Sequence, residues 1–432
     1  MGGMLEILRN AWKIPDLRRK LLFTIAMLIV FRIGTHIPVP GLDADRFAEL
    51  LASTGSLGGF LDIVSGGALK LATIFAMSIT PYINSSIIMQ LLTVAIPSLE
   101  RLQKEGEEGR KIIQQYVRYG TVVLGLIQAI GLYFTMQSGG AIADGGSIWS
   151  FLTVVLSFTA GTAFLMWLGE QINEYGIGNG ISLIIFAGIV SRGPQGALGI
   201  IDTYKLGNFG PGILGIFGII LVLAMFVAMI SLVIWVQQAE RRIPIQYAKR
   251  MVGRKMYGGQ STHLPIKVNL AGVIPIIFAM SIMMFPSTII TMFFAGADNW
   301  FVNLFKNPQK SVAYPIIYAL LIIFFTFFYS VIQFNPIEIS NNMKKNGGFI
   351  PGLRPGKPTS DYISKVLNRV TWFGGFFLAA VTVLPIILGN VTNIDGLWMS
   401  GTALLILVGV ALDTIKQVES QMLMRHYKGF LE

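Results

Sequence analysis

Long apolar stretches recur along this chain, and they constrain its fold more than any other feature. A helix needs roughly 20 mostly apolar residues to cross the hydrocarbon core of a bilayer. Stretches near that length lie at about 21–37, 71–96, 117–137, 150–169, 178–192, 211–236, 268–296, 312–333, 371–388 and 398–416. With 53% hydrophobic and only 13% charged residues, we expect an all-α integral membrane protein with ten transmembrane helices.

The basic residues predict the orientation of these spans. An even number of spans puts both termini on one side, and cytoplasmic segments are richer in Lys and Arg than external ones. Most of the 33 Lys and Arg residues fall in the N-terminal arm, the C-terminal tail and loops on that same side. We therefore expect both termini to be cytoplasmic. The first span runs into HIPVPG rather than a small-residue cleavage site, so we expect it to be retained.

Two of the basic loops, about 237–267 and 334–370, are longer than most connections between helices. They are either docking surfaces or ordinary cytoplasmic loops that follow the charge rule. An apolar segment at about 57–70 is too short to cross, and Asp62, Lys70 and two Gly pairs interrupt it. It is either a re-entrant half-helix that plugs a cavity or a short helix on the membrane surface.

Residues that could carry chemistry are scarce inside the spans. Their interiors hold no Asp or Glu, with Asp413 at the end of the last span, which disfavours proton-coupled transport. Cysteine is absent and the three histidines are far apart, so no metal site is indicated. The nearest phosphate-loop candidate, 352–358, has the wrong glycine spacing and lacks the Ser or Thr. We expect no enzymatic activity, no cofactor and a passive pore driven by a partner, with a secondary transporter as the alternative.

A series of motifs runs through the chain in a fixed order. They are RIGTHIPVPG at 32–41, SGGAL at 65–69, IFAMSITPYI at 74–83, IIMQLL at 87–92, EGEEGR at 105–110, GEQI at 169–172, GIGNGIS at 176–182, RRIPIQYAKR at 241–250, PIKVNLAGVIP at 265–275 and GLRPG at 352–356. In these motifs the chain resembles the SecY family of protein-export channels along nearly its whole length.

The resemblance implies two pseudo-symmetric five-helix halves, 1–192 and 211–432, joined by an external hinge loop at 193–210. They would enclose a central pore with a short plug helix in a bacterial plasma membrane. The implied function is translocation of unfolded secretory polypeptides and lateral release of membrane helices into the lipids. Implied partners are the SecE and SecG subunits, the SecA motor ATPase, the ribosome, and signal peptides and nascent polypeptides. An insertase or a scaffold for other membrane proteins is a related alternative.

Carried over by position, the resemblance also implies site residues. The apolar pore ring would consist of Ile79, Ile83, Ile185, Ile189, Ile277 and Ile406, and the plug would include Phe60, Leu61, Ile63, Val64, Ser65, Gly66 and Gly67. The lateral gate would include Pro81, Gln90, Gln128 and Pro275, and motor or ribosome docking would use Arg241, Arg242, Lys249, Arg250, Arg354 and Tyr427.

From the residues alone, isoleucines in membrane helices usually serve ordinary packing or lipid contact, so only the resemblance assigns these six to a ring. Packing between helices explains the two glutamines equally well. Pro81 and Pro275 are expected inside their helices, where each would favour a kink.

Overall fold

The computed structural model is dominated by long helices that follow the expected spans. It describes residues 4–53, 62, 65–142, 146–205, 213–247, 250–252, 255–257, 261–293, 302, 304–305, 311, 313–392 and 397–428. Each expected span overlaps one long helix. In chain order these are α2 (Pro15–Gly34), α5 (Thr80–Ala95), α7 (Glu107–Ser138), α8 (Ile148–Tyr175), α9 (Gly180–Lys205), α10 (Ile213–Gln238), α11 (Ile274–Phe293), α13 (Ala313–Gln333), α15 (Lys357–Thr392) and α16 (Leu397–Lys428).

Length and composition alone identify fewer membrane spans than the sequence pattern does. Among the described residues, five helices are long and apolar enough to cross a membrane, or six if the bent pair of α5 and α6 (Pro97–Lys104) is one span. Three shorter apolar helices lie at Gly180–Pro194, Leu223–Gln238 and Ile274–Met283. The count of ten crossings therefore remains a prediction.

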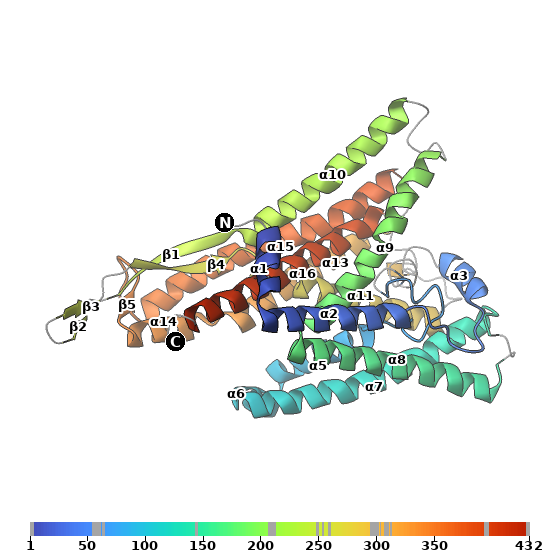
Figure 1. The fold of residues 1–432 in the computed structure, drawn as a ribbon, viewed down its shortest axis with the longest axis horizontal. Helices are drawn as coiled ribbons and strands as arrows, with labels where there is room; N and C mark the ends of the chain where they lie inside the picture. The colour runs from blue at the N-terminus through green and yellow to red at the C-terminus, as the bar shows by residue number, and fades with distance from the viewer. Residues whose placement is uncertain are drawn as a thin grey trace.

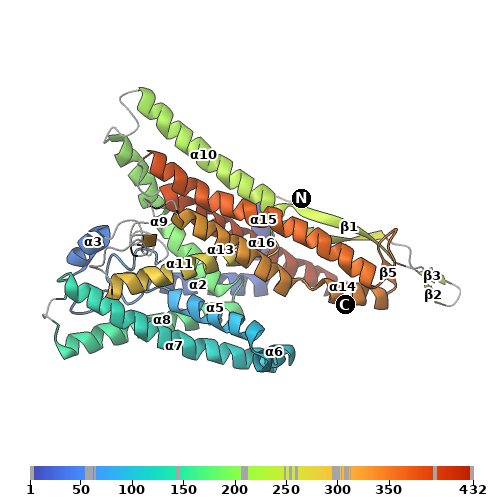
Figure 2. The same ribbon diagram turned by 180° about the vertical axis from the view of Figure 1, so that it is seen from behind.

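The helices form two neighbouring groups. Helices α2, α5, α7 and α8 lie side by side along one flank, and α10, α13, α15 and α16 along the other (Figure 1). Helix α11 lies between the groups and contacts α5, α7 and α13 (Figure 2). Helix α9 joins them on another side, because it contacts α8, α10 and α16. The largest hydrophobic cluster lies where these groups meet and draws residues from both.

One end of the bundle carries the strands and both chain termini, and we call it the strand end (Figure 1). Strands β1 (Glu240–Tyr247), β4 (Ser261–Lys267) and β5 (Gly348–Phe349) form an antiparallel sheet in the order β4-β1-β5, and β2 (Arg250–Val252) pairs with β3 (Lys255–Tyr257). Helix α14 (Pro336–Lys345) lies near this sheet, α1 (Met4–Lys13) precedes α2, and α3 (Ala44–Ser53) lies at the opposite end (Figure 1).

The second expected span, 71–96, begins later than the sequence predicts. Residues 65–79 form consecutive turns, and α5 starts only at Thr80. Ala72 and Ser78 have positive φ angles of 47° and 53°, which an α-helix cannot accommodate. Within the expected plug segment at about 57–70, the described residues 65–70 are turn rather than helix, whereas Asp62 is helical.

The expectation that Pro81 and Pro275 lie inside helices is wrong. Pro81 is in the first turn of α5, and Pro275 is the second residue of α11. Proline suits this position because the N–H that it lacks has no helical partner there. Pro286 lies inside α11 instead, and the sequence analysis did not single it out.

Three expected loops contain more regular structure than predicted. Helix α9 continues to Lys205, so most of the segment 193–210 is helical rather than a hinge loop. Pro194, the only proline in 193–210, lies inside this helix. The apolar pattern that defined the expected span ends before Pro194, at about residue 192. The loop 237–267 contains four strands, and 334–370 contains α14, β5 and the start of α15.

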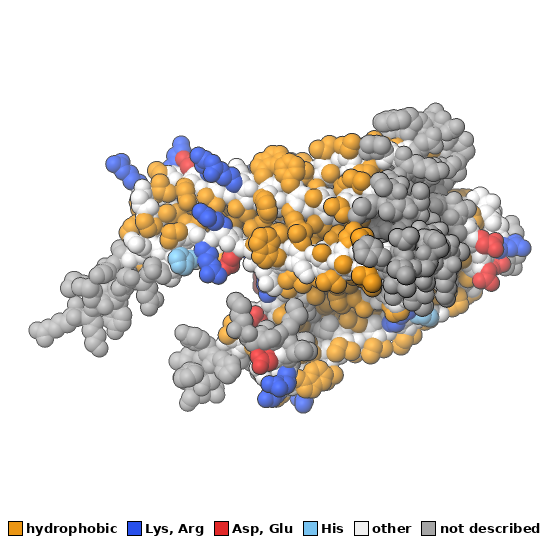
Figure 3. Space-filling model, turned by 90° about the horizontal axis from the view of Figure 1, so that it is seen from above, with side chains coloured by type: hydrophobic (Ala, Val, Ile, Leu, Met, Phe, Trp, Pro, Cys, Tyr) orange, Lys and Arg blue, Asp and Glu red, His pale blue; other side chains and the backbone are white. Residues whose placement is uncertain are grey.

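The chemical type of the surface side chains changes along the long axis of the bundle. Hydrophobic side chains cover the middle of the bundle, and Lys and Arg gather mainly toward the strand end (Figure 3). Large exposed apolar residues on α13 and α15 include Ile316, Leu320, Phe324, Trp372 and Phe373. A soluble domain would bury side chains of this size, whereas a lipid bilayer covers them.

Candidate functional site

The six isoleucines of the expected ring are all buried in the largest hydrophobic cluster. They come from α5, α9, α11 and α16, and so from both groups of helices. Ile79 caps the N-terminus of α5 and Ile83 lies one turn further on, with its N–H bonded to the Ile79 carbonyl. Because the helix repeats every 3.6 residues, this spacing keeps both side chains on one face. The same spacing holds for Ile185 and Ile189 on α9.

The start of α5 places its two isoleucines at the depth where the helix groups meet. The preceding turns bring the chain inward from the opposite end, and the Thr80–Pro81 step begins the helix. Helix α11 then contacts α5 next to this point, which brings Ile277 into the same cluster. An apolar junction of several helices can exclude water and ions, since aliphatic side chains offer an ion nothing to replace its hydration shell.

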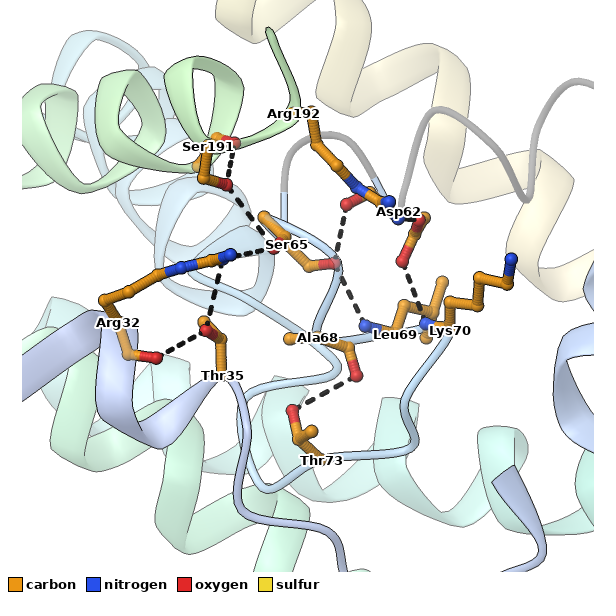
Figure 4. A network of polar contacts seen from close by, with 12 residues as sticks. Arg32, Thr35, Asp62, Ser65, Ala68, Leu69, Lys70, Thr73, Ser191 and Arg192 are labelled. Atoms are coloured by element: carbon orange, nitrogen blue, oxygen red, sulfur yellow. Dashed lines mark hydrogen bonds and ion pairs between the residues drawn. The ribbon is translucent and has the colours of Figure 1, made fainter. Parts of the chain in front are cut away.

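A network of polar contacts holds the segment just outside this junction (Figure 4). The Asp62 carboxylate forms an ion pair with Arg192, in the middle of α9, and accepts a hydrogen bond from the Lys70 N–H at 2.8 Å. Arg32, near the end of α2, donates to the Gly66 carbonyl at 2.9 Å. Ser65 closes the turn internally, donating to the Asp62 carbonyl at 3.0 Å and accepting from the Leu69 N–H at 3.1 Å.

Only part of the expected plug can be placed. Phe60, Leu61, Ile63 and Val64 lie outside the described residues, whereas Ser65, Gly66 and Gly67 are described and buried. The sequence analysis missed the roles of Arg32 and Arg192. A signal did exist, because both are cations at the end of an apolar stretch that faces away from the basic loops, against the general charge bias.

One of the expected gate residues, Gln90, is bonded to a residue of the other helix group. Tyr329 of α13 donates its hydroxyl hydrogen to the Gln90 side-chain carbonyl on α5, and the Gln90 amide donates to Ser86 at 3.4 Å. Gln90 is thus hydrogen-bonded to the other helix group through Tyr329, a residue that the sequence analysis did not name. Gln128 lies half-buried on α7, a helix that also contacts α11.

Aromatic packing surrounds this hydrogen bond. The ring of Phe278 on α11 lies 5.0 Å from that of Tyr329, centroid to centroid, in an edge-to-face arrangement, and 6.0 Å from that of Phe325. Edge-to-face pairs at such separations are favourable beyond the area that they bury. Helices α5, α11 and α13 therefore meet through apolar packing that surrounds the Tyr329–Gln90 hydrogen bond.

The expected docking residues lie at the strand end, where the two basic loops share a small core. Ile243, Ile245 and Ile266 of the strands pack with Met343 of α14 and Leu367 of α15. Strand β1 pairs with β5 through Gln246–Phe349 and Tyr247–Gly348, which joins loops about 100 residues apart in sequence.

Three of the docking residues are exposed on this shared unit, namely Arg241, Arg242 and Arg354. Arg242 pairs with Glu240 at 2.7 Å. Lys249 lies outside the described residues, and the side chains of Arg250 and Tyr427 are likewise not described. Among the described residues, no group of three or more His, Asp or Glu side chains could hold a metal ion.

Comparisons with known proteins agree with this architecture. The family model described as SecY matches residues 73–415. The chain is 47% identical to a protein translocase subunit SecY of Streptomyces scabiei, over 99% of this chain and 100% of that protein. It is 46% identical to the subunit of that name from Thermotoga maritima, over 99% of this chain and 98% of that protein.

Solved structures share the fold at lower sequence identity. A structure described as a protein conducting channel matches with a TM-score of 0.59 and 19% identity, covering 94% of this chain and 92% of that one. A structure concerned with the plug domain of SecY matches with a TM-score of 0.60 and 18% identity, with the same coverage. Sec61 in a canine ribosome-channel complex matches with a TM-score of 0.55 and 17% identity, again over 94% and 92%.

Proposed function

The chain belongs to the SecY family of protein translocase subunits, and from this premise we propose how its residues conduct polypeptides. The protein is a protein-conducting channel rather than an enzyme. Its two helix groups act as halves, 1–192 and 211–432, around a pore that the apolar ring closes from within and the segment before α5 closes from outside. One observation carries this proposal: six isoleucines from four helices lie buried in one cluster where the groups meet.

The ring suits a channel that must pass many sequences and still retain ions. Aliphatic walls gate by dewetting and form no sequence-specific hydrogen bonds with an extended chain. Unfolded secretory polypeptides of any sequence can therefore pass, whereas small ions meet a dry constriction when the pore is empty. The driving force comes from a partner, because the chain offers no nucleotide site of its own.

Polar substitution in the ring tests the seal. We expect Ile277→Asn or Ile83→Asn to hydrate the constriction and to raise the ion conductance of the substrate-free channel several-fold in planar bilayers. Ile316→Asn is the matched control, because Ile316 is 55% exposed on the outside of α13. Conductance that stays at the wild-type level in both ring variants would show that these isoleucines only pack the bundle.

Signal sequences enter through the seam between α5, α7 and α11, which is the lateral gate of this proposal. Gln90, Gln128 and the first turns at Pro81 and Pro275 line that seam. The Tyr329–Gln90 hydrogen bond holds the seam closed. An apolar signal helix replaces the contacts between the helices of the seam. Membrane-protein helices leave the channel through the same seam and enter the lipid. This replacement favours the most apolar segments, since the seam offers them aromatic and aliphatic partners.

The strand end faces the cytoplasm in this proposal, so both termini are cytoplasmic and the segment 62–79 is external. The excess of Lys and Arg at that end supports it. The chain has no cysteine, which allows a direct test with a membrane-impermeant maleimide on intact bacterial cells. A thiol introduced at Ser147, exposed at the start of α8, should react, and one at Asn341 on α14 only after lysis. The reverse pattern would overturn the orientation.

The shared unit at the strand end is the docking surface for the ribosome and for the SecA motor. Exposed arginines meet ribosomal RNA phosphates or acidic protein surfaces, so binding is expected to weaken with salt. We expect Arg354→Glu to reduce motor-driven export in reconstituted vesicles and to leave the channel folded, because Arg354 is exposed. Lys345→Glu reverses a charge on α14 of the same unit, so it tests whether export depends on the position of Arg354 or only on the positive charge of the unit. Unchanged export by Arg354→Glu would contradict this assignment.

Two small membrane subunits, SecE and SecG, complete the channel in this proposal. The apolar side chains exposed on the outside of the bundle are available to partner helices and lipid alike. Purification of the chain from membranes in mild detergent tests this point. Recovery of the chain without either small subunit would contradict it.

A further inference from the structure

Two contacts made by charged side chains hold the segment around Gly66 in place. Neither contact involves a residue of the expected ring or gate. We propose that Arg192 and Arg32 are positioning residues for the plug. Arg192 holds the Asp62 carboxylate, Arg32 holds the Gly66 carbonyl, and both contacts must break before a polypeptide can pass. We call these two contacts the plug latch. The inference rests on the proposed function, because it takes the segment that includes 65–79 as the plug.

Asp62 is the central group of the latch. The exposed fractions of the Asp62 and Arg192 side chains are 10% and 21%, so the pair is largely removed from water. One carboxylate oxygen faces Arg192, and the other accepts the Lys70 N–H at 2.8 Å. The same carboxylate therefore closes the turn and fastens it to α9. Loss of Arg192 leaves the largely buried Asp62 charge with the neutral Lys70 N–H in place of a cation, which is more costly than loss of an exposed pair.

Arg32 holds the turn from a second direction. Arg32 reaches it from α2 and Arg192 from α9 (Figure 4). The Arg32 guanidinium donates to the Gly66 carbonyl at 2.9 Å, and a charged donor makes a stronger bond than a neutral one. Contacts from two helices fix the position of the turn, whereas one contact would allow it to pivot.

The turn is shaped to approach α9 closely. Gly66 and Gly67 have φ angles of +69° and +92°, a region that disfavours other residues. A Cβ atom at Gly66 would lie 3.1 Å from the Gly188 Cα, and one at Gly67 would lie 3.3 Å from the Arg192 Cζ. The missing side chains let the backbone approach within reach of both arginines. The seat is thus fitted to this segment and to this pair of charges.

Both contacts of the latch lie in the N-terminal half, on α2 and α9. Leu69, Ala72 and Ala76 pack against side chains of α7 and α8 in that half, and Ala68 and Phe75 belong to the cluster that both halves share. The lateral gate, in contrast, lies between the halves. Separation of α5 from α11 therefore leaves the latch intact, and the latch sets a separate threshold for displacement of the plug.

Charge exchange tests the latch in the channel complex purified with its small subunits. Ala68 is a fully buried residue of the turn. The chain has no cysteine, so Ala68→Cys introduces its only thiol. In that background, we expect Asp62→Arg and Arg192→Asp each to raise the rate of maleimide labelling at least about tenfold. Substrate-free conductance should rise with it. The double variant with both exchanges should return both quantities toward wild type.

Two further variants guard against loss of folding. Asp62→Asn keeps the size of the side chain and an acceptor for the Lys70 N–H but removes the charge, and it should also raise labelling. Arg46→Asp disrupts the exposed Asp43–Arg46 pair at the same end, with side-chain exposures of 43% and 67%, and should change neither quantity.

The outcomes separate this inference from the proposed function. Unchanged labelling in the single variants, or no recovery in the double variant, overturns the latch whatever the ring variants show. Faster labelling with recovery, but without a rise in conductance, establishes the latch and overturns the assignment of this segment as a seal. A rise and recovery of both quantities supports both.

Discussion

Where Asp62 and the segment 65–79 meet α2 and α9, the fastening contacts are charged, because Arg32 binds a backbone carbonyl and Arg192 binds the Asp62 carboxylate. Where α11 meets α5 and α13, the contacts are aliphatic and aromatic, with one hydroxyl-to-amide bond between Tyr329 and Gln90. The first set lies within one half of the chain, and the second joins the halves. The two closures therefore differ both in chemistry and in the motion that opens them.

This difference indicates what each closure responds to. Apolar packing can be exchanged for other apolar packing at little cost, so a hydrophobic helix can take the place of α11 at the seam. A buried ion pair has no such substitute and opens only when its charges are rehydrated or paired elsewhere. We therefore expect the proposed gate to discriminate between signal sequences by hydrophobicity, and the proposed plug seat to resist opening until water or a charged segment reaches it.

The largest expected effect is a steric one at the plug seat. A Cβ atom at Gly161 of α8 would lie 1.9 Å from the Ile74 carbonyl oxygen. We expect Gly161→Ala to displace the backbone after the plug and to destabilise the protein by about 3 kcal/mol. A lower melting temperature of the purified complex and faster labelling of the Ala68→Cys thiol would report it. The gate should be unaffected.

A glycine in the other half supplies the control. A Cβ at Gly375 of α15 would lie 3.6 Å from the Ile323 Cα, an ordinary contact. Gly375→Ala should therefore leave melting and labelling close to wild type. If the two alanine variants behaved alike, the close fit of the plug segment against α8 would have no special importance.

A smaller effect is expected at the gate. Tyr329→Phe keeps the ring that packs on Phe278 and removes the hydrogen bond to Gln90. A lost hydrogen bond of this kind is worth about 1 kcal/mol, or a roughly fivefold shift toward the open gate. Less hydrophobic signal sequences should then be exported, as measured with a graded series of signals. Labelling at the plug should stay unchanged if the two closures are independent.

Tyr133 provides the matched control for removal of a hydroxyl. Its Oη is buried and has no hydrogen-bond partner among the described residues. Tyr133→Phe should therefore cost nothing and leave signal selection unchanged, because no bond is lost. A change in export as large as that of Tyr329→Phe would mean that the Tyr329 effect does not come from its bond to Gln90.

The sequence predicted the helices well and their contacts poorly. Hydropathy located a helix at every expected span, because apolar length is a local property. It misplaced the start of α5, since positive φ angles at Ala72 and Ser78 have no signature in apolar composition. The strands in 237–267 were not predicted either, because this basic segment was interpreted from its length and charge alone, and neither indicates that β1 pairs with β4 and β2 with β3.

The candidate site divides in the same way. Family motifs pointed to six isoleucines that the structure buries in one cluster, although their assignment as a pore ring stays a prediction. Arg32 and Arg192 were visible only as charges in unusual places, and their shared target appears once the turn at Gly66 is folded. Tyr329 gave no signal at all, because a tyrosine in an apolar helix is common.

The smallest effect tests whether charge, rather than hydrogen bonding in general, holds the plug. The Ser191 hydroxyl oxygen lies 3.5 Å from the Gly66 carbonyl oxygen and 2.7 Å from the Gly188 carbonyl oxygen, to which it donates its hydrogen bond. A hydroxyl has one hydrogen, and the shorter bond takes it. Ser191→Ala should therefore change labelling of the Ala68→Cys thiol by less than about twofold, whereas Arg32→Gln, which removes a charged donor to the same carbonyl, should exceed that. Equal effects of the two variants would mean that the seat depends on the number of donors and not on their charge.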